Sequence, residues 1–213
     1  MSGLMVGERK VESSKKNALI LASGSETRRR MLVNAGLSFD VIRAQVDEEA
    51  LKESLLAETA PAKDVADSLA DAKARSVTMM HPGRVVLGAD QILVQDGRVF
   101  SKAKTAEQAK TTLKALSGQA HRLISAAVIY EGDQPVWRAA TTATLTMRNL
   151  SDEFIDYYLT ALGDDAFWSV GCYQLEGLGA QLFSKIDGDY FTILGLPLLP
   201  VLDFLRGRAI VPT

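Results

Sequence analysis

The chain has 213 residues, enough for one domain or for two small lobes that share a core. Hydrophobic residues make up 47% and charged residues 23%, a composition that excludes a disordered or fibrous protein. The 24 Lys and Arg residues nearly balance the 26 Asp and Glu residues, and the net charge of −2 argues against a nucleic-acid-binding surface. A single cysteine, Cys172, excludes an internal disulfide, and two histidines are too few for a typical structural zinc site.

The N-terminal 17 residues are polar and lack the apolar core of a signal peptide. We expect residues 1–17 to be a flexible extension and residues 18–213 to form a single domain. The most apolar stretch, residues 194–205, contains two prolines and Asp203 and is too short to cross a membrane. The sequence therefore predicts a cytoplasmic protein without a membrane partner, a location that also suits its single cysteine.

Short apolar runs alternate with helical patterns in the first half of the chain. Residues 18–22 form a continuous apolar run, typical of a strand buried on both faces, and Ser25 suits the N-cap of a helix that stops at Gly36. Asp96 and Gly97 lie between two apolar segments and predict a type I′ hairpin. The other elements expected here are a strand over 39–44, a helix after Asp47, a long helix over 61–80 and a buried strand over 85–89.

The second half begins with a helix that Thr105 caps and that ends near Gly118. The elements expected after it are strands over 122–130 and 136–147, a helix over 151–162, a strand over 180–186 and a helix over 197–206. Strands and helices thus alternate around an antiparallel middle stretch. This order predicts an α/β fold built on one extended mixed sheet.

A loop of small residues, Ser23-Gly24-Ser25, joins the first strand to the first helix, and Arg28 falls in the first helical turn. Free backbone N–H groups and the helix dipole favour an anion at this place, and a guanidinium group can donate two hydrogen bonds to phosphate oxygens. A capped helix with a solvated basic face would carry the same residues. The local pattern leaves both interpretations open.

A second candidate is Asp90, which follows the apolar run over 85–87 at the expected carboxyl end of a strand. A carboxylate there could activate water or bind Mg²⁺, although an acid that only ends a strand is also common. Lys73, Lys102 and Glu48 are each more typical of a surface than of a site. In combination, however, such cations and acids suit a complex of a metal ion with a triphosphate.

A third candidate is the glycine-rich segment around Glu176, Gly177 and Gly179, because such glycines allow a ligand to approach the backbone. We expect Glu176 to be buried beside a strand and to need a partner. A guanine edge, which offers an N1–H and an amino group, would satisfy both oxygens. Trp168 and Tyr173 are expected to pack in the core or in an interface rather than to serve as stacking platforms for a base.

Taken together, these motifs resemble the Maf family of nucleoside triphosphate pyrophosphatases. The similar segments, in chain order, are 19–29, 47–48, 72–74, 88–91, 101–102, 116–118, 176–179, 188–190 and 195–198. The resemblance implies an elongated mixed central sheet with helices on both sides and a cleft between two lobes, related to the inosine triphosphate pyrophosphatase fold. It also implies hydrolysis of a nucleoside triphosphate to the monophosphate and pyrophosphate with Mg²⁺ or Mn²⁺, and a homodimer.

The resemblance also assigns roles to individual residues of this chain. The catalytic base matches Asp90, and the metal-binding residues match Glu48 and Asp90. The phosphate-binding residues match Ser23, Ser25, Arg28, Lys73 and Lys102.

The base-specificity positions are Thr27, Gln91 and Glu176, and the last two are similar to the YceF-like branch, which prefers 7-methyl-GTP. The chain departs from the family at Glu26, where Pro is usual, and from that branch at Thr27, where a Trp that could stack on 7-methylguanine is frequent. The expected substrate is a modified or guanine-type nucleotide. The alternatives are a dTTP/UTP pyrophosphatase and a non-catalytic nucleotide-binding regulator of cell division.

Overall fold

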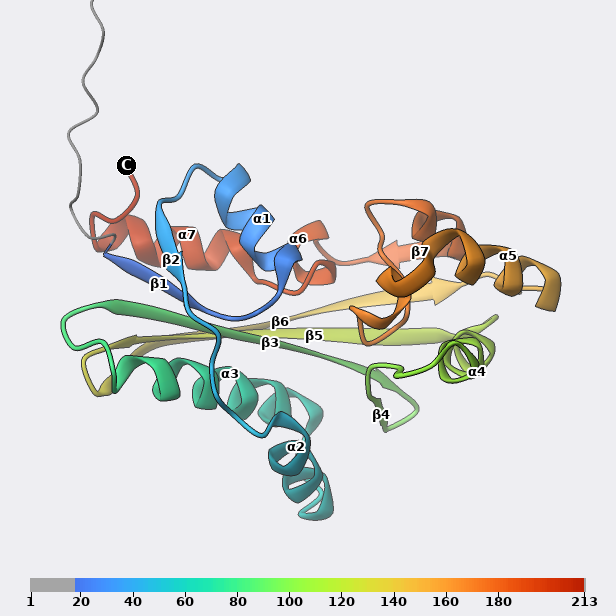
Figure 1. Cartoon of the computed structure of the whole chain (residues 1–213), viewed down its shortest axis with the longest axis horizontal. Helices are drawn as coiled ribbons and strands as arrows, with labels where there is room; N and C mark the ends of the chain where they lie inside the picture. The colour runs from blue at the N-terminus through green and yellow to red at the C-terminus, as the bar shows by residue number, and fades with distance from the viewer. Residues whose placement is uncertain (1–17, 213) are drawn as a thin grey trace, which may run out of the picture.

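A seven-stranded mixed sheet runs along the molecule (Figure 1). The computed structural model describes residues 18–212, so the expected extension over residues 1–17 lies outside the described residues. The strands are β1 (Leu19–Ala22), β2 (Phe39–Val41), β3 (Val85–Gln95), β4 (Arg98–Phe100), β5 (Ala120–Glu131), β6 (Gln134–Met147) and β7 (Phe183–Asp187). Their order is β2-β1-β3-β5-β6-β7, with β4 paired to β3, and only β1 with β2 and β1 with β3 are parallel.

Helices cover both faces of this sheet (Figure 1). The helices are α1 (Glu26–Asn34), α2 (Glu48–Ala57), α3 (Ala62–Thr78), α4 (Ala106–Leu116), α5 (Asp152–Leu162), α6 (Tyr190–Ile193) and α7 (Leu198–Gly207). One core lies between α3 and the sheet, a second joins the opposite face to α1 and α7, and a third surrounds α4 and α5 at the other end. The mixed α/β architecture with helices on both sides of an elongated sheet is therefore confirmed.

Local sequence signals account for most element boundaries. The side chains of Ser25, Thr105 and Ser151 each accept a hydrogen bond from the backbone three residues on, as N-caps do. The hairpin between β3 and β4 is confirmed by the positive φ angles of Asp96 (47°) and Gly97 (80°). The strand expected over 180–186 is partly wrong, because a 3₁₀ helix over Leu178–Leu182 delays the start of β7 to Phe183.

Asp90 does not end a strand, and this expectation is wrong. β3 continues to Gln95 because its antiparallel partner β5 pairs with it from Val85 to Val94. Its parallel neighbour β1 is short, and the last pair between them joins Ala22 to Gly88. Asp90 therefore lies two residues beyond the point where β1 stops, on a part of β3 that has lost its neighbour on that side.

The alternation of side chains along β3 decides what Asp90 faces. Val86 and Ile92 belong to the core beneath α3, whereas Leu87 and Ala89 belong to the core of α1 and α7. Asp90 has the even parity of the first pair. Its side chain therefore points to the face that α3 covers.

Gly88 lets α3 approach this face closely. A Cβ atom at Gly88 would lie 2.2 Å from the carbonyl oxygen of Ala70 and 2.7 Å from the backbone nitrogen of Ala74. Both contacts are with helix backbone, which cannot turn aside as a flexible side chain can. The residue between these alanines on the buried face of α3 is Lys73. The glycine therefore controls the distance between Lys73 and β3.

We expect Gly88→Ala to destabilise the protein by about 1–3 kcal/mol, because the added methyl group must push α3 away from β3. Chemical denaturation measures the change in the free energy of unfolding. The control is Gly207→Ala, because a Cβ at Gly207 would meet nothing within 4 Å apart from its own chain neighbours and the backbone of its own helix. That change should be neutral or slightly stabilising. Equal stability of Gly88→Ala and the wild type would contradict the role of this contact.

Candidate active site

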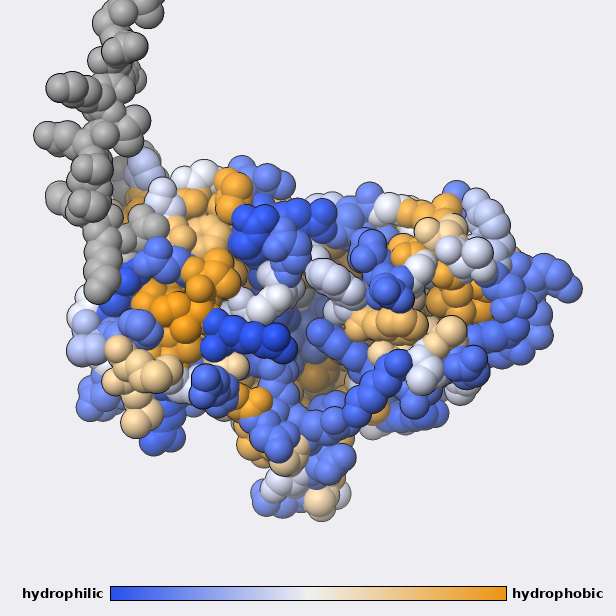
Figure 2. Space-filling model, in the orientation of Figure 1, coloured by the Kyte–Doolittle hydropathy of each residue, from blue (hydrophilic) through white to orange (hydrophobic). Residues whose placement is uncertain are grey.

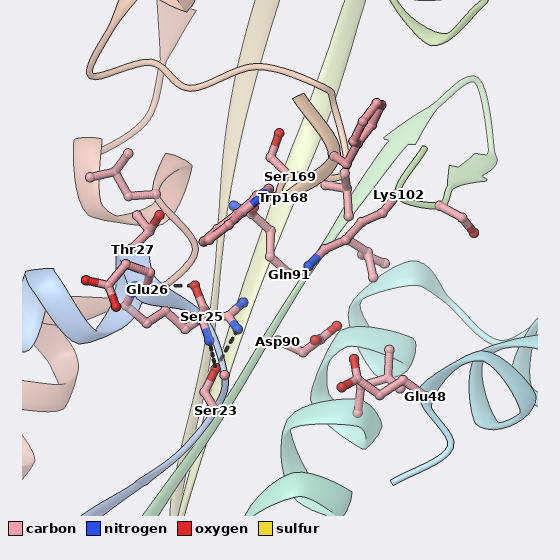
Figure 3. Close-up of a pocket in the computed structure, with 18 of the residues that line it drawn as sticks. Ser23, Ser25, Glu26, Thr27, Glu48, Asp90, Gln91, Lys102, Trp168 and Ser169 are labelled. Atoms are coloured by element: carbon pink, nitrogen blue, oxygen red, sulfur yellow. Dashed lines mark hydrogen bonds between the residues drawn. The ribbon is translucent and has the colours of Figure 1, made fainter. Parts of the chain in front are cut away.

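A cavity of about 560 Å³ opens where β1 ends and β3 continues. Figure 2, which has the orientation of Figure 1, shows a hollow near the middle of the molecule that is bordered largely by hydrophilic residues. Gly177 and Gly179 do not line this cavity, whereas every residue to which the resemblance assigns a role does, and most of these are labelled in Figure 3. The residues with an assigned role are Ser23, Ser25, Thr27, Arg28, Glu48, Lys73, Asp90, Gln91, Lys102 and Glu176. Six separate segments of the chain contribute these residues, so the fold brings together what the sequence could only group by type.

Arg28 is a buried cation at the start of α1. Its Nε donates to the carbonyl oxygen of Gly195 at 2.7 Å, and its Nη1 donates to Ser23 Oγ at 3.2 Å. Burial lowers the pKa of Arg28, although the nearby carboxylates partly offset this effect. The backbone N–H of Ser25 also donates to Ser23 Oγ, at 3.2 Å. The two hydrogen bonds of the guanidinium group hold it at the cavity wall, where it can meet an anion.

Lys73 holds two carboxylates together. Its Nζ lies 2.5 Å from Asp90 Oδ1 and 2.8 Å from Glu48 Oε2. The Lys73 side chain is only 7% exposed, so its charge needs these partners. An ammonium group has three N–H donors, and the two carboxylates take two of them. One donor of Lys73 and the second oxygen of Asp90 remain for a ligand.

Lys102 follows β4 and extends its amine into the cavity (Figure 3). Burial lowers the pKa of Lys102, and repulsion by Arg28 and Lys73 lowers it further, while Glu48 and Asp90 act in the opposite direction. Arg28, Lys73 and Lys102 thus place three cationic groups around one cavity. Such a concentration of positive charge suits a polyanion such as a polyphosphate.

Gln91 lines the cavity and also holds α6. Its Nε2 lies 3.1 Å from Ser125 Oγ, 2.9 Å from the carbonyl oxygen of Thr192 and 3.0 Å from that of Ile193. Because these acceptors surround the amide nitrogen, the amide oxygen is the part of Gln91 that a ligand could use. A substitution at this position would therefore disturb α6 as well as any bound ligand.

Glu176 is not buried beside a strand, and this expectation is wrong. It lies in the loop before the 3₁₀ helix Leu178–Leu182, and its side chain is 22% exposed. Its Oε1 lies 3.1 Å from Arg30 Nη2 on α1. The partner that Glu176 needs thus comes from 146 positions away in the sequence. Thr27, one helical turn before Arg30, lines the same cavity.

The sequence alone did not point to several residues of the cavity wall. Trp168, expected in the core or in an interface, is 60% exposed and lines the cavity. Other lining residues that it did not single out are Arg43, Lys52, Lys104, Ser169 and Gln174. Their residue types suit a binding site. However, no spacing in the sequence connects them with Asp90, and only the folded chain brings them to this wall.

Tyr173 anchors the loop that carries Trp168 and Glu176. Its hydroxyl lies 2.7 Å from Nε2 of the buried His121, and its backbone exchanges two hydrogen bonds with Ser169 Oγ. A Cβ at Gly171 would lie 2.2 Å from the Tyr173 ring, so the chain passes directly over the aromatic ring. Tyr173 is 5% exposed, as expected for a core residue. These contacts fix the wall of the cavity from behind.

The carboxylates of the cavity suit a metal site that the protein and a phosphate ligand form together. Among residues 18–212 there is no group of three or more His, Cys, Asp or Glu side chains that could hold a metal ion. Asp90 and Glu48 instead converge in a pair on Lys73. Mg²⁺ is commonly held by one or two carboxylates together with substrate phosphates. The pair therefore fits a cation that enters with a phosphate ligand.

The fold and the site define an α/β protein with a cleft that cationic side chains line beside paired carboxylates. A family model described as Maf-like protein matches residues 18–208, and the chain belongs to this family. A protein of Jannaschia sp. (strain CCS1) named nucleoside triphosphate pyrophosphatase 1 is 50% identical over 91% of this chain and 98% of its own length. A protein of Rhizobium meliloti (strain 1021) named 7-methyl-GTP pyrophosphatase is 49% identical over 90% of this chain and 96% of its own length.

Within residues 18–212, no helix is both long enough and apolar enough to span a bilayer.

We expect the stability of the protein to fall between about pH 6.5 and pH 4 through His121. Burial lowers the pKa of His121 to about 4. In this range His121 binds a proton in the unfolded chain but not in the folded protein. The stability that neutral His121 contributes is therefore fully present above pH 6.5 and is lost as the pH falls. The loss amounts to about 3 kcal/mol. His121→Gln should flatten this dependence.

Urea denaturation at pH 7 and pH 4.5 measures the difference for each variant. The control is His81→Gln, which replaces the other histidine of the chain. This variant should lose as much stability between pH 7 and pH 4.5 as the wild type does. If His121→Gln loses as much stability between pH 7 and pH 4.5 as the wild type does, His121 is not the source of the pH dependence.

Proposed function

We propose that this protein hydrolyses a nucleoside triphosphate to the monophosphate and pyrophosphate. The contact that carries this proposal is the ion pair of Lys73 with Asp90 and Glu48, placed in a cavity that Arg28 and Lys102 also line. A carboxylate beside several cations combines a proton acceptor with groups that neutralise phosphate oxygens. The names of the two relatives agree with this chemistry.

Asp90 acts as the general base in this proposal. Lys73 fixes Oδ1 of Asp90, and Oδ2 accepts a proton from water. The water oxygen bonds to the α-phosphorus, the bond from this phosphorus to the bridging oxygen of the β-phosphate breaks, and pyrophosphate leaves. Arg28 and Lys102 hold the phosphate oxygens and offset the negative charge that develops on them.

Glu48 and Asp90 would hold a divalent cation, Mg²⁺ or Mn²⁺, that enters with the triphosphate. When bound, such an ion supplies further positive charge on the phosphate oxygens. Residues 18–212 contain no cluster of three or more His, Cys, Asp or Glu side chains that could hold the cation by protein ligands alone. The substrate phosphates and water complete the coordination.

The preferred base is of the guanine type, and 7-methyl-GTP is the specific candidate. The two oxygens of Glu176 only accept hydrogen bonds, and a guanine edge presents two donors to them. Uracil and thymine would instead present a carbonyl oxygen to this carboxylate, and the repulsion would be costly once water is excluded. The ion pair with Arg30 is half-exposed on the arginine side, so it is weak enough for a base to take its place.

Removal of the catalytic carboxylate of Asp90 should distinguish an enzyme from a non-catalytic nucleotide-binding protein. We expect Asp90→Asn to lower the rate of pyrophosphate release by about 10²–10⁴-fold, because the amide keeps the shape but does not accept the proton. The assay uses GTP, 7-methyl-GTP, dTTP and UTP with Mg²⁺. A wild-type rate in the variant would refute the role of Asp90.

The matched control is Asp96→Asn, a change of the same chemistry in the hairpin at the end of β3. Asp96 is exposed, outside the cavity, and has a positive φ that Asn tolerates well. It should keep the wild-type rate and the wild-type melting temperature. Asp90→Asn should keep its circular dichroism spectrum, which shows that lost activity is not lost folding.

The base preference is tested by Glu176→Gln. We expect this variant to shift the ratio of kcat/KM for GTP to that for UTP by about 10- to 100-fold towards UTP, because the amide can donate to a pyrimidine carbonyl. The single change is cleaner than one combined with Gln91→Thr, since Gln91 also holds α6.

Arg30→Gln is the control for the broken ion pair, because it removes the partner and keeps the carboxylate. It should retain the preference for guanine. If the wild type hydrolyses dTTP or UTP as efficiently as GTP and 7-methyl-GTP, the chain is a dTTP/UTP pyrophosphatase instead. The homodimer and the cytoplasmic location stay predictions from the sequence.

A further inference from the structure

Trp168 is a large aromatic side chain that the folding of this chain leaves uncovered. It is 60% exposed, although tryptophan is usually well buried. Among residues 18–212, it takes part in none of the aromatic pairs and no hydrogen bond of its indole N–H is present. The second tryptophan, Trp137, packs on Phe204 with ring centroids 5.6 Å apart. An unpartnered indole at a cavity wall is therefore free to pack against a ligand.

The loop that carries Trp168 is held in place. The backbone N–H of Trp168 donates to Asp165, and the next residue, Ser169, is bonded twice to the backbone of Tyr173. Tyr173 is in turn bonded to His121. The backbone that carries the indole is thus held by hydrogen bonds, so a ligand would not have to order this loop.

The cavity is lined by both charged and apolar side chains. Arg28, Lys73 and Lys102 provide the charge. The apolar lining residues include Phe167, Trp168, Val170, Leu175 and Leu194. Figure 3 shows the indole projecting into the cavity that Gln91 and Lys102 also line. The two kinds of side chain match the two chemical ends of a nucleotide, because phosphates suit the cations and a base suits the apolar side chains.

We propose that Trp168 is the stacking platform for the nucleobase, and that its electron-rich face favours a purine with a positive ring charge, such as an N7-methylated guanine. This inference rests on the proposed function. A flat base gains from stacking on indole, and a cationic ring gains more through the cation–π interaction. Glu176, eight residues further along the same held loop, can accept hydrogen bonds from the edge of the same base. Thr27 offers no aromatic ring for this purpose.

The test uses the fluorescence of Trp168 itself, because the chain has only two tryptophans. Trp137→Phe leaves Trp168 as the single indole. We expect 7-methyl-GMP to quench its emission strongly and GMP to quench it less, because a stacked base contacts the indole directly. Tripolyphosphate carries the phosphates without a base and should leave the emission unchanged. Absence of quenching by 7-methyl-GMP at concentrations that inhibit the enzyme would overturn the proposal.

Steady-state kinetics supplies a second measurement. Trp168→Leu should raise the KM for 7-methyl-GTP by about 10- to 100-fold with little change in kcat, while Trp168→Phe should recover most of the loss. A wild-type KM in Trp168→Leu would overturn the proposal. If Trp137→Phe does not fold, the difference in quenching between the wild type and Trp168→Phe reports the same contact.

These outcomes are distinguishable from a failure of the proposed function. Without pyrophosphate release from any nucleotide, the pyrophosphatase assignment fails, yet quenching of Trp168 by a nucleotide still detects a base-binding wall. If pyrophosphate release is normal but there is no quenching and no change in KM, the pyrophosphatase assignment is kept and the stacking role of Trp168 is rejected.

Discussion

A buried ammonium group organises the centre of this molecule. Lys73 lies on the apolar face of α3, and its charge is compensated by Asp90 on β3 and Glu48 on α2. A buried lysine without such partners would be costly, so the three elements must stay together. The close approach depends on Gly88, because no side chain fits between β3 and the backbone of α3 at this level. One glycine in a strand therefore sets the geometry of the cleft.

β3 distributes the chemistry of the cavity over both faces of the sheet. Asp90 points towards α3 and the cations, whereas Gln91 points towards α6 and the carbonyl oxygens of Thr192 and Ile193. This division is possible because β1 ends opposite Gly88 and β4 begins to pair only at Leu93, so residues 89–92 have no neighbouring strand on that side. Two adjacent residues thereby serve a charged part and a more neutral part of one site.

The loop between α5 and β7 forms the wall opposite these groups. Tyr173 holds it from behind through hydrogen bonds with His121 and Ser169, although the loop has little regular structure. Glu176 reaches across to Arg30 on α1 through a partly exposed ion pair, an interaction worth at most about 1 kcal/mol. A firm support combined with a weak contact across the cleft suits a site that must admit and release a charged ligand.

The sequence by itself determined the local structure and the list of candidate residues. Caps such as Ser25, the Asp96-Gly97 turn and the apolar runs depend on near neighbours in the chain, and all appear in the structure. Tertiary structure alone decided the position of Asp90 within a long strand, the burial of Lys73, the pairing of Glu176 with Arg30 and the exposure of Trp168. These features depend on strand pairing, on the approach of α3 to β3 and on contacts between residues up to 146 positions apart, which no local pattern encodes.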